Sequence, residues 1–160
     1  MPPGFLVKVV SGGQTGVDRA ALDVALERGI PCGGWCPHGR RAEDGRIPAR
    51  YPLSQTPSAA YPQRTAWNVR DSNGTLVLTA GPADRGTALT LTLAERFGKP
   101  LLHLDLEGAP RPEQATGWVR RHWVRVLNVA GPRESRCPGI SAKAGWFLRE
   151  VLDRLAGEGQ

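Results

Sequence analysis

Three short glycine-bearing segments stand where a predicted strand gives way to a predicted helix, and their chemistry is anion binding. They carry Gly12, Gly13 and Gly16 in the first segment, Gly81 in the second and Gly131 in the third. The first turn of a helix offers free N–H groups and the positive end of the helix dipole, which favour phosphate or another oxyanion. Because the carboxyl ends of parallel strands meet at one edge of a sheet, we expect these loops to converge there. The pattern predicts a site for an anion or a nucleotide-like ligand.

The first of these segments, Ser-Gly-Gly-Gln-Thr-Gly at residues 11–16, matches neither common phosphate signature. It lacks the Lys-Ser/Thr ending of a phosphate-binding loop, and its glycines do not have the dinucleotide-binding spacing. An NTPase and an ordinary NAD-dependent oxidoreductase are therefore disfavoured.

Two carboxylates lie at the starts of the helices that follow the first two segments. Asp18 either caps its helix through a backbone N–H or accepts a hydrogen bond from a ligand, and the sequence leaves both open. Asp84 is expected to be an N-cap, with Thr87 near the same helix start.

Residues 31–63 are rich in Pro, Gly and Arg without periodicity, and a loop of that length in a compact domain tends to be functional. Its arginines either hold a planar heterocycle with a phosphate tail, together with nearby aromatic rings, or pin the loop through internal ion pairs. The residues concerned are Arg40, Arg41, Glu43, Asp44, Arg46, Arg50, Tyr51, Tyr61 and Trp67.

The same segment contains a Cys-x3-Cys-x-His cluster formed by Cys32, Cys36 and His38, whereas Cys137 lies elsewhere. A zinc site needs four ligands, so a free cysteine pair is expected, although thiolates also suit a softer metal centre. An odd number of cysteines argues against a disulfide framework and indicates the reducing cytoplasm.

Apolar patterning supplies the elements that would position these residues. Strands are expected over 5–10, 75–79, 101–106 and 124–129, and helices over 18–28, 84–97, 112–122 and 141–155. The apolar face of the second helix is expected to comprise Ala88, Leu91, Ala94 and Phe97. Alternating strands and helices imply parallel βαβ units. The predicted fold class is α/β, a single Rossmann-like three-layer domain with a mostly parallel sheet over residues 1–160.

Composition is that of one globular domain, with 40% apolar and 22% charged residues in 160. The net charge of +6 rests on 18 Arg and 3 Lys, which fits either an anionic ligand or a solvated Arg-rich surface. Arginines near Trp118 and Trp123 suggest nucleic-acid binding as one hypothesis. Because the sequence has no known nucleic-acid-binding motif, a solvated face or a subunit contact is favoured. The chain shows neither a run of ~20 apolar residues nor a signal-peptide pattern, so a cytoplasmic protein is expected.

Five motifs together resemble those of the molybdenum carrier family, the circularly permuted YpsA-like members of the SLOG superfamily. They lie at residues 11–18, 34–45, 68–72, 81–89 and 128–135, so the resemblance covers about residues 6–155. It implies a Rossmann-like fold, a homo-oligomer (dimer or tetramer), and a site for a nucleotide-derived ligand or for molybdenum cofactor, a phosphorylated pterin that carries a dithiolene-bound metal. The ligand positions that it implies are Gly12, Gly13, Gln14, Thr15, Gly86, Thr87, Arg133, Glu134 and Ser135.

A sister branch of that superfamily cleaves nucleoside monophosphates with a glutamate three residues after a Gly-Thr pair. Here Thr90 stands at that place after Gly86-Thr87, which disfavours the reaction. The predicted function is a non-catalytic carrier of molybdenum cofactor or a related phosphorylated heterocycle. The alternatives are a nucleotide N-glycosidase that uses Asp18 or Glu134, and a nucleotide-ligand sensor.

Overall fold

The computed structural model describes residues 4–157, and its centre is a five-stranded sheet in which every neighbouring pair of strands is parallel. The strand order is β2-β1-β9-β7-β8. The strands are β1 (Lys8–Val10), β2 (Cys32–Gly33), β7 (Gly74–Thr79), β8 (Leu101–Asp105) and β9 (Val126–Ala130). Four of them fall within or beside the predicted strands, whereas the two-residue edge strand β2 has no counterpart in the predicted pattern.

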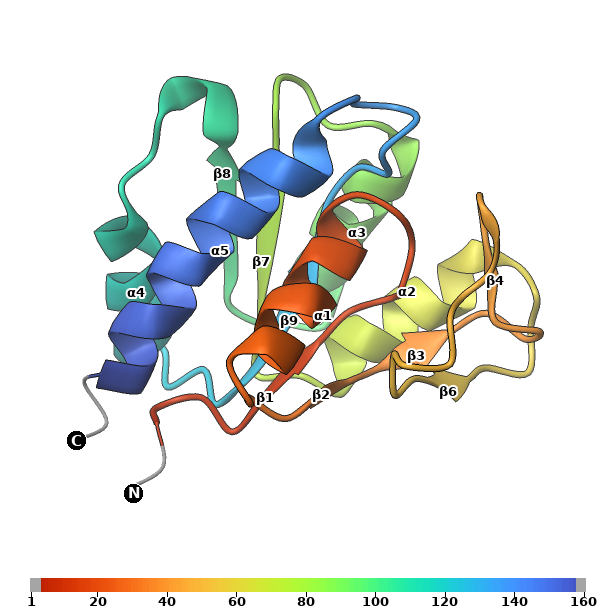
Figure 1. Ribbon diagram of the computed structural model, residues 1–160, viewed down its shortest axis with the longest axis horizontal. Coiled ribbons are helices and arrows are strands. Elements are labelled where there is room, and N and C mark those ends of the chain that lie inside the picture. The colour runs from red at the N-terminus through yellow and green to blue at the C-terminus, as the bar shows by residue number, and fades with distance from the viewer. Residues whose placement is uncertain (1–3, 158–160) are drawn as a thin grey trace.

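Helices cover both faces of the sheet, which confirms the predicted Rossmann-like three-layer α/β fold (Figure 1). One face carries α1 (Val17–Glu27), α4 (Pro112–Arg121) and α5 (Ile140–Gly157), with α5 packed against both other helices. The opposite face carries α2 (Tyr61–Arg70) and α3 (Arg85–Arg96), which pack on each other. A short 3-10 helix, η1 (Leu106–Gly108), follows β8. Among the described residues, no helix is long and apolar enough to cross a membrane.

The two faces of the sheet differ in polarity. Because side chains alternate along a strand, Leu76 and Leu78 of β7 join the large apolar core with α1, α4 and α5, whereas Thr75 and Thr79 take the alternate positions. In the neighbouring strand the buried Asn128 amide donates to the Thr75 hydroxyl at 3.2 Å. The face that carries α2 and α3 therefore includes buried polar groups.

Helix α3 departs from its predicted orientation. Its buried residues are Thr87, Thr90 and Ala94, whereas Phe97 is 43% exposed and Ala88 is exposed. Of the predicted apolar face, Ala94 is buried and Leu91 is half-buried, whereas the prediction was wrong for Ala88 and Phe97, because the helix turns two threonines toward the polar side of the sheet.

Residues 31–60 are mostly irregular, as predicted, but contain two small β elements. Strand β3 (Trp35–Cys36) pairs with β6 (Ser54–Gln55), and β4 (Arg41–Ala42) pairs with β5 (Gly45–Arg46) in an antiparallel hairpin. The Arg40 guanidinium, in a residue only 9% exposed, donates to the carbonyls of four loop residues: Ile47, Pro48, Tyr51 and Leu53. Arg40 thus pins the segment internally, but through hydrogen bonds to carbonyls, whereas the sequence hypothesis invoked ion pairs.

The cysteines of this segment belong to a small apolar cluster beneath it. Cys36 is fully buried with Leu22, Ile47 and Tyr51, and Cys32 packs against the same group. Burial raises the pKa of both thiols, which keeps them protonated at neutral pH. The structure describes no group of three or more His, Cys, Asp or Glu residues placed to hold a metal ion.

Candidate functional site

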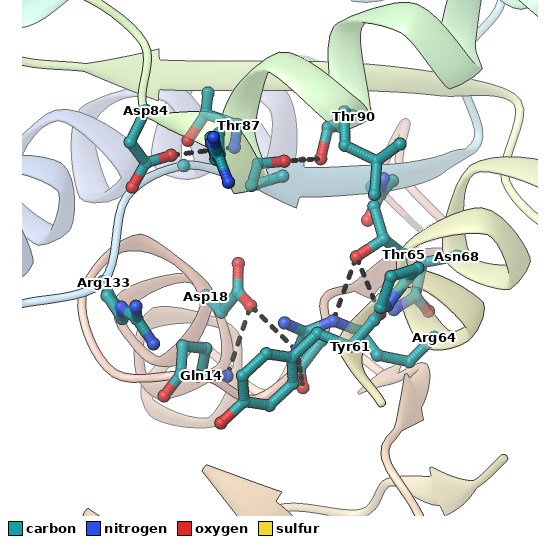
Figure 2. A pocket seen from close by; sticks show the side chains of 18 of the residues that line it. Gln14, Asp18, Tyr61, Arg64, Thr65, Asn68, Asp84, Thr87, Thr90 and Arg133 are labelled. Atoms are coloured by element: carbon teal, nitrogen blue, oxygen red, sulfur yellow. Dashed lines mark hydrogen bonds and ion pairs between the residues drawn. The ribbon is translucent and has the colours of Figure 1, made fainter. Parts of the chain in front are cut away.

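A cavity of about 650 Å³ opens at the carboxyl ends of the central strands. Its walls come from the loop after β1, from α2, from the first turns of α3, and from β9 with the loop that follows it. Figure 2 shows Asp84, Thr87 and Thr90 facing Gln14, Asp18 and Arg64 across this space. The chain leaves β1 toward α1 on one face of the sheet and leaves β7 toward α3 on the other. The cavity therefore lies where α/β sheets commonly bind ligands.

The N-terminus of α3 presents unused donors to the cavity. The Asp84 carboxylate caps the helix by accepting from the Thr87 N–H at 2.8 Å, which confirms the predicted N-cap. Within the described part of the chain, the N–H groups of Arg85 and Gly86 donate to no protein acceptor. Thr87 is only 3% exposed and lines the cavity, and its hydroxyl has no hydrogen-bond partner. Such a group costs about 1–3 kcal/mol unless something binds it, so this corner is prepared for a polar ligand.

Asp18 is one of the two acidic residues that line the cavity. One oxygen accepts from the Gln14 N–H at 3.2 Å and lies 3.8 Å from Arg64 Nη1. Figure 2 shows the other oxygen directed into the open space. Burial raises the pKa of Asp18 to about 6, against the lowering effect of Arg64 and the Gln14 hydrogen bond. Asp18 thus bonds the loop before α1 and still has an oxygen available to a ligand.

The cavity has a positive balance of charge. Four guanidinium groups line it, from Arg64, Arg85, Arg133 and Arg136, against the two carboxyl groups of Asp18 and Asp84. Arg64 is held in place by donating to the Gly12 carbonyl at 2.8 Å. An anionic ligand is therefore favoured electrostatically.

Seven of the fourteen predicted site residues line the cavity: Gly12, Gln14, Asp18, Gly86, Thr87, Gly131 and Arg133. Three of the other predicted glycines have structural contacts. Gly13 packs beneath Ile47 and Leu53, and the Gly81 N–H donates to Asp105 at 3.0 Å. Gly16 has φ +83° and lies so close to Pro132 that a Cβ would stand 2.3 Å from its carbonyl oxygen. Their positions support the loops that shape the site.

The four remaining predicted residues lie beside the cavity in contacts of their own. Arg41 donates to the Ala59 carbonyl at 3.1 Å, and its guanidinium lies 4.9 Å from the centroid of the Tyr61 ring, which lines the cavity. The Glu134 carboxylate accepts from the Gly139 and Ser141 N–H groups, at 2.6 and 3.0 Å. The Glu134 carboxylate therefore supplies hydrogen-bond acceptors to the free N–H groups at the start of α5.

The hydroxyls of the last two predicted residues, Thr15 and Ser135, both donate to Glu43. At the start of α1, the Val17 N–H donates to the Pro132 carbonyl at 3.3 Å. Among the helix starts expected to bind anions, that of α3 has two consecutive N–H groups, of Arg85 and Gly86, that donate to no acceptor in the described part of the chain and belong to residues that line the cavity.

Sequence reasoning named Tyr61 as a candidate for stacking on a heterocycle, but it missed helix α2 itself, which also supplies Arg64 and Thr65 to the cavity wall. The available signal was Pro62 in the first turn of the helix, a preferred place for proline. It also missed Arg136 and the polar Asn128 within an otherwise apolar strand, both of which line the cavity.

Comparisons with known proteins place the chain in a family. The model of the circularly permutated YpsA SLOG family matches residues 9–152. Among solved structures, the chain is similar to a crystal structure from Syntrophus aciditrophicus named "Putative molybdenum carrier protein". The identity is 44% and the TM-score 0.88, over 94% of this chain and 97% of the other. A comparison with curated proteins finds no match. The resemblance inferred from the sequence motifs is confirmed: the chain belongs to the circularly permutated YpsA SLOG family.

Proposed function

We propose that the protein is a carrier that binds molybdenum cofactor, or a related phosphorylated pterin or nucleotide-derived molecule, in the cavity between α2 and α3. The observation that carries this proposal is the buried Thr87 hydroxyl without a partner, next to the free N–H groups of Arg85 and Gly86. The name of the Syntrophus protein supports molybdenum as the cargo.

The residues present fit such a cargo. A terminal phosphate suits the start of α3, where the unused donors lie and where Arg133 and Arg136 add positive charge. Asp18 suits the heterocycle, because an ionised carboxylate accepts from the ring N–H groups of a pterin. The volume of about 650 Å³ is within the range of small-molecule and cofactor sites. When bound, the cofactor would supply the redox chemistry of its metal to a recipient, while this chain binds and shields it.

The carrier role is proposed without a catalytic residue, because the glutamate of the nucleotide-cleaving branch is replaced. Thr90 takes that position, and its hydroxyl donates to the Gly86 carbonyl at 3.3 Å within the helix. Glu134, the other carboxylate considered for catalysis, caps α5 instead of lining the cavity.

One observation favours a second candidate function, nucleotide N-glycosidic cleavage. Asp18 is a cavity carboxyl group with a pKa of about 6, which suits general acid or base chemistry near neutral pH. Incubation with a panel of nucleoside monophosphates, followed by chromatography for free base, tests it. Release by the wild type and not by Asp18→Asn would establish the activity, and no release by the wild type would refute it.

The carrier proposal is tested by mixing the protein anaerobically with isolated molybdenum cofactor. The measurements are the cofactor retained on gel filtration, followed by pterin fluorescence after oxidation, and its lifetime in air. We expect wild-type protein to retain and protect the cofactor. Thr87→Val should bind it about tenfold or more weakly, because one hydrogen bond to a charged group is lost. Asp44→Asn, altered on the β4–β5 hairpin and outside the cavity lining, is the matched control. Wild-type protein that neither retains nor protects the cofactor would refute the proposal.

We also propose that the chain forms a homo-oligomer, dimer or tetramer, as its family resemblance implied. Two large apolar residues, Trp123 at 69% and Trp146 at 65%, are exposed on its surface, and burying their rings at a subunit contact would be favourable. Light scattering during gel filtration measures the mass directly, and a monomer at micromolar concentration would contradict the proposal.

A further inference from the structure

The carboxylate of Glu43 lies within a ring of donors that belong to other parts of the chain. Glu43 is in the turn of the β4–β5 hairpin, whereas the donors come from the loops after β1 and β9. The hydroxyls of Thr15 and Ser135 both donate to it, the Ser135 N–H donates at 3.2 Å, and Arg133 Nε lies 3.6 Å away. Three segments far apart in the sequence therefore meet at one carboxylate.

This donor set is suited to a tetrahedral oxyanion. Two hydroxyls, a backbone N–H and a guanidinium are groups that proteins use to hold phosphate. Partial burial would raise the pKa of Glu43, but the hydrogen bonds from Ser135 and Thr15 and the charge of Arg133 outweigh it, so the pKa lies below its ordinary value. Glu43 consequently stays anionic at neutral pH and satisfies the donors as a bound anion would.

We propose that the ring formed by Thr15, Arg133 and Ser135 is a second oxyanion site, and that Glu43 is its built-in occupant, which an incoming tetrahedral oxyanion displaces. The chemical class of the ligand is a phosphate-like dianion. The hydroxyl donors, Thr15 and Ser135, are separate from those at α3, and Arg133 is the one group shared with the cavity, so the inference does not depend on the identity of the ligand proposed there.

The hairpin has other attachments that would hold it when Glu43 moves out. Arg19 forms a two-pronged pair with the neighbouring Asp44, and Arg41 bonds the Ala59 carbonyl. The exchange would also reach the cavity, because Arg133 lines it and the Gln14 side chain accepts from the Glu43 N–H at 2.9 Å. Displacement of Glu43 would thus release Arg133 and Gln14 from contacts that they make while Glu43 is bound.

The test vacates the site and asks whether inorganic oxyanions fill it. Calorimetric titration with phosphate, and separately with sulfate and molybdate, is compared between the wild type and Glu43→Ala. We expect Glu43→Ala to bind at least one of them tenfold or more tightly than the wild type, and to gain more thermal stability from it. Asp44→Ala, which alters the adjacent carboxylate of the same turn and leaves the donor ring intact, should behave as the wild type.

Second variants locate the effect. In the Glu43→Ala background, Thr15→Val with Ser135→Ala should abolish the gain, whereas Thr87→Val should leave it unchanged. Equal anion affinity in wild type and Glu43→Ala would overturn the inference, as would a gain that Thr87→Val removes, because the anion would then bind at α3. If Glu43→Ala does not fold, Glu43→Gln answers the same question, since it removes the competing charge. Unchanged anion affinity in that variant would also overturn the inference. The proposal that the cavity binds the cofactor is tested separately, by the cofactor-retention experiment.

Discussion

Thr87 offers a prediction in which stability and binding change in opposite directions. Its hydroxyl is buried without a partner, so the folded protein without ligand carries the cost of an unmade hydrogen bond. Valine has nearly the same shape and lacks the hydroxyl. Because a buried unpaired hydroxyl costs about 1–3 kcal/mol, Thr87→Val should raise the free energy of unfolding by about 1 kcal/mol or more. For a chain of this length that corresponds to an increase in Tm of about 2–4 °C.

The measurement is urea unfolding and thermal unfolding of both proteins without ligand, and Thr90 supplies the matched control. Thr90 lies one turn further along the same helix, is also buried and also lines the cavity, but its hydroxyl donates to the Gly86 carbonyl. Thr90→Val should therefore leave stability unchanged or lower it. If Thr87→Val proves less stable than the wild type by a margin equal to that of Thr90→Val, the Thr87 hydroxyl is satisfied in solution and is no mark of a ligand site.

Three further predictions follow from contacts in and around the site. The pKa of Asp18 is raised to about 6 in the folded state, so protonation of this carboxyl group favours folding. The free energy of unfolding should therefore fall by about 3 kcal/mol as the pH rises from about 4 to about 6, and should level off above that range. Urea unfolding across this pH range measures the slope, which Asp18→Asn should abolish. Gly12→Ala would place a Cβ 2.5 Å from Arg64 Nη1, so it should displace that side chain and weaken binding of an anionic ligand about tenfold, with an unchanged far-UV circular dichroism spectrum. Arg40→Ala should destabilise the protein by about 3 kcal/mol or more in urea unfolding, because several loop carbonyls lose a charged donor, whereas exposed Arg46→Ala should have little effect.

Apolar periodicity predicted those elements whose burial is decided by the main core. Strands β7, β8 and β9 and helices α1, α4 and α5 were found within a few residues of their bounds, because the groups that bury them are consecutive or helically spaced in the sequence. Helix α2 was not predicted, since it buries Arg64, Asn68 and Val69 and has no apolar stripe. Asn68 is retained inside because it exchanges two hydrogen bonds with the Trp35 backbone, at 2.8 and 2.9 Å. That pairing spans more than thirty residues and leaves no local pattern.

The candidate site was predicted in part for a similar reason. Strand–glycine–helix junctions are local, so the convergence of the loops at Gly12 and Gly131 could be inferred from the strand order that parallel units require. Which helix start remains free for a ligand is decided by distant partners instead. The Glu134 carboxylate accepts from N–H groups at the start of α5, and the hairpin brings Glu43 to the loop after β1. Within residues 4–157, by contrast, no side chain accepts from the N–H groups of Arg85 and Gly86.

The orientation of α3, which apolar periodicity predicted incorrectly, places Thr87 and Thr90 toward the cavity and therefore bears on its function. If α3 had fully buried Ala88, Leu91 and Phe97, as its apolar periodicity suggested, an apolar helix face would have packed against the sheet. No polar cavity would then remain between them. The observed orientation exposes Phe97 and buries two hydroxyls, one bonded within the helix and one without a partner. A folded chain tolerates such a loss of apolar burial and of a hydrogen bond where both are recovered on binding. The orientation of α3 is therefore itself an argument that the cavity exists for a ligand, and the stability gain of Thr87→Val measures how much of that cost the hydroxyl contributes.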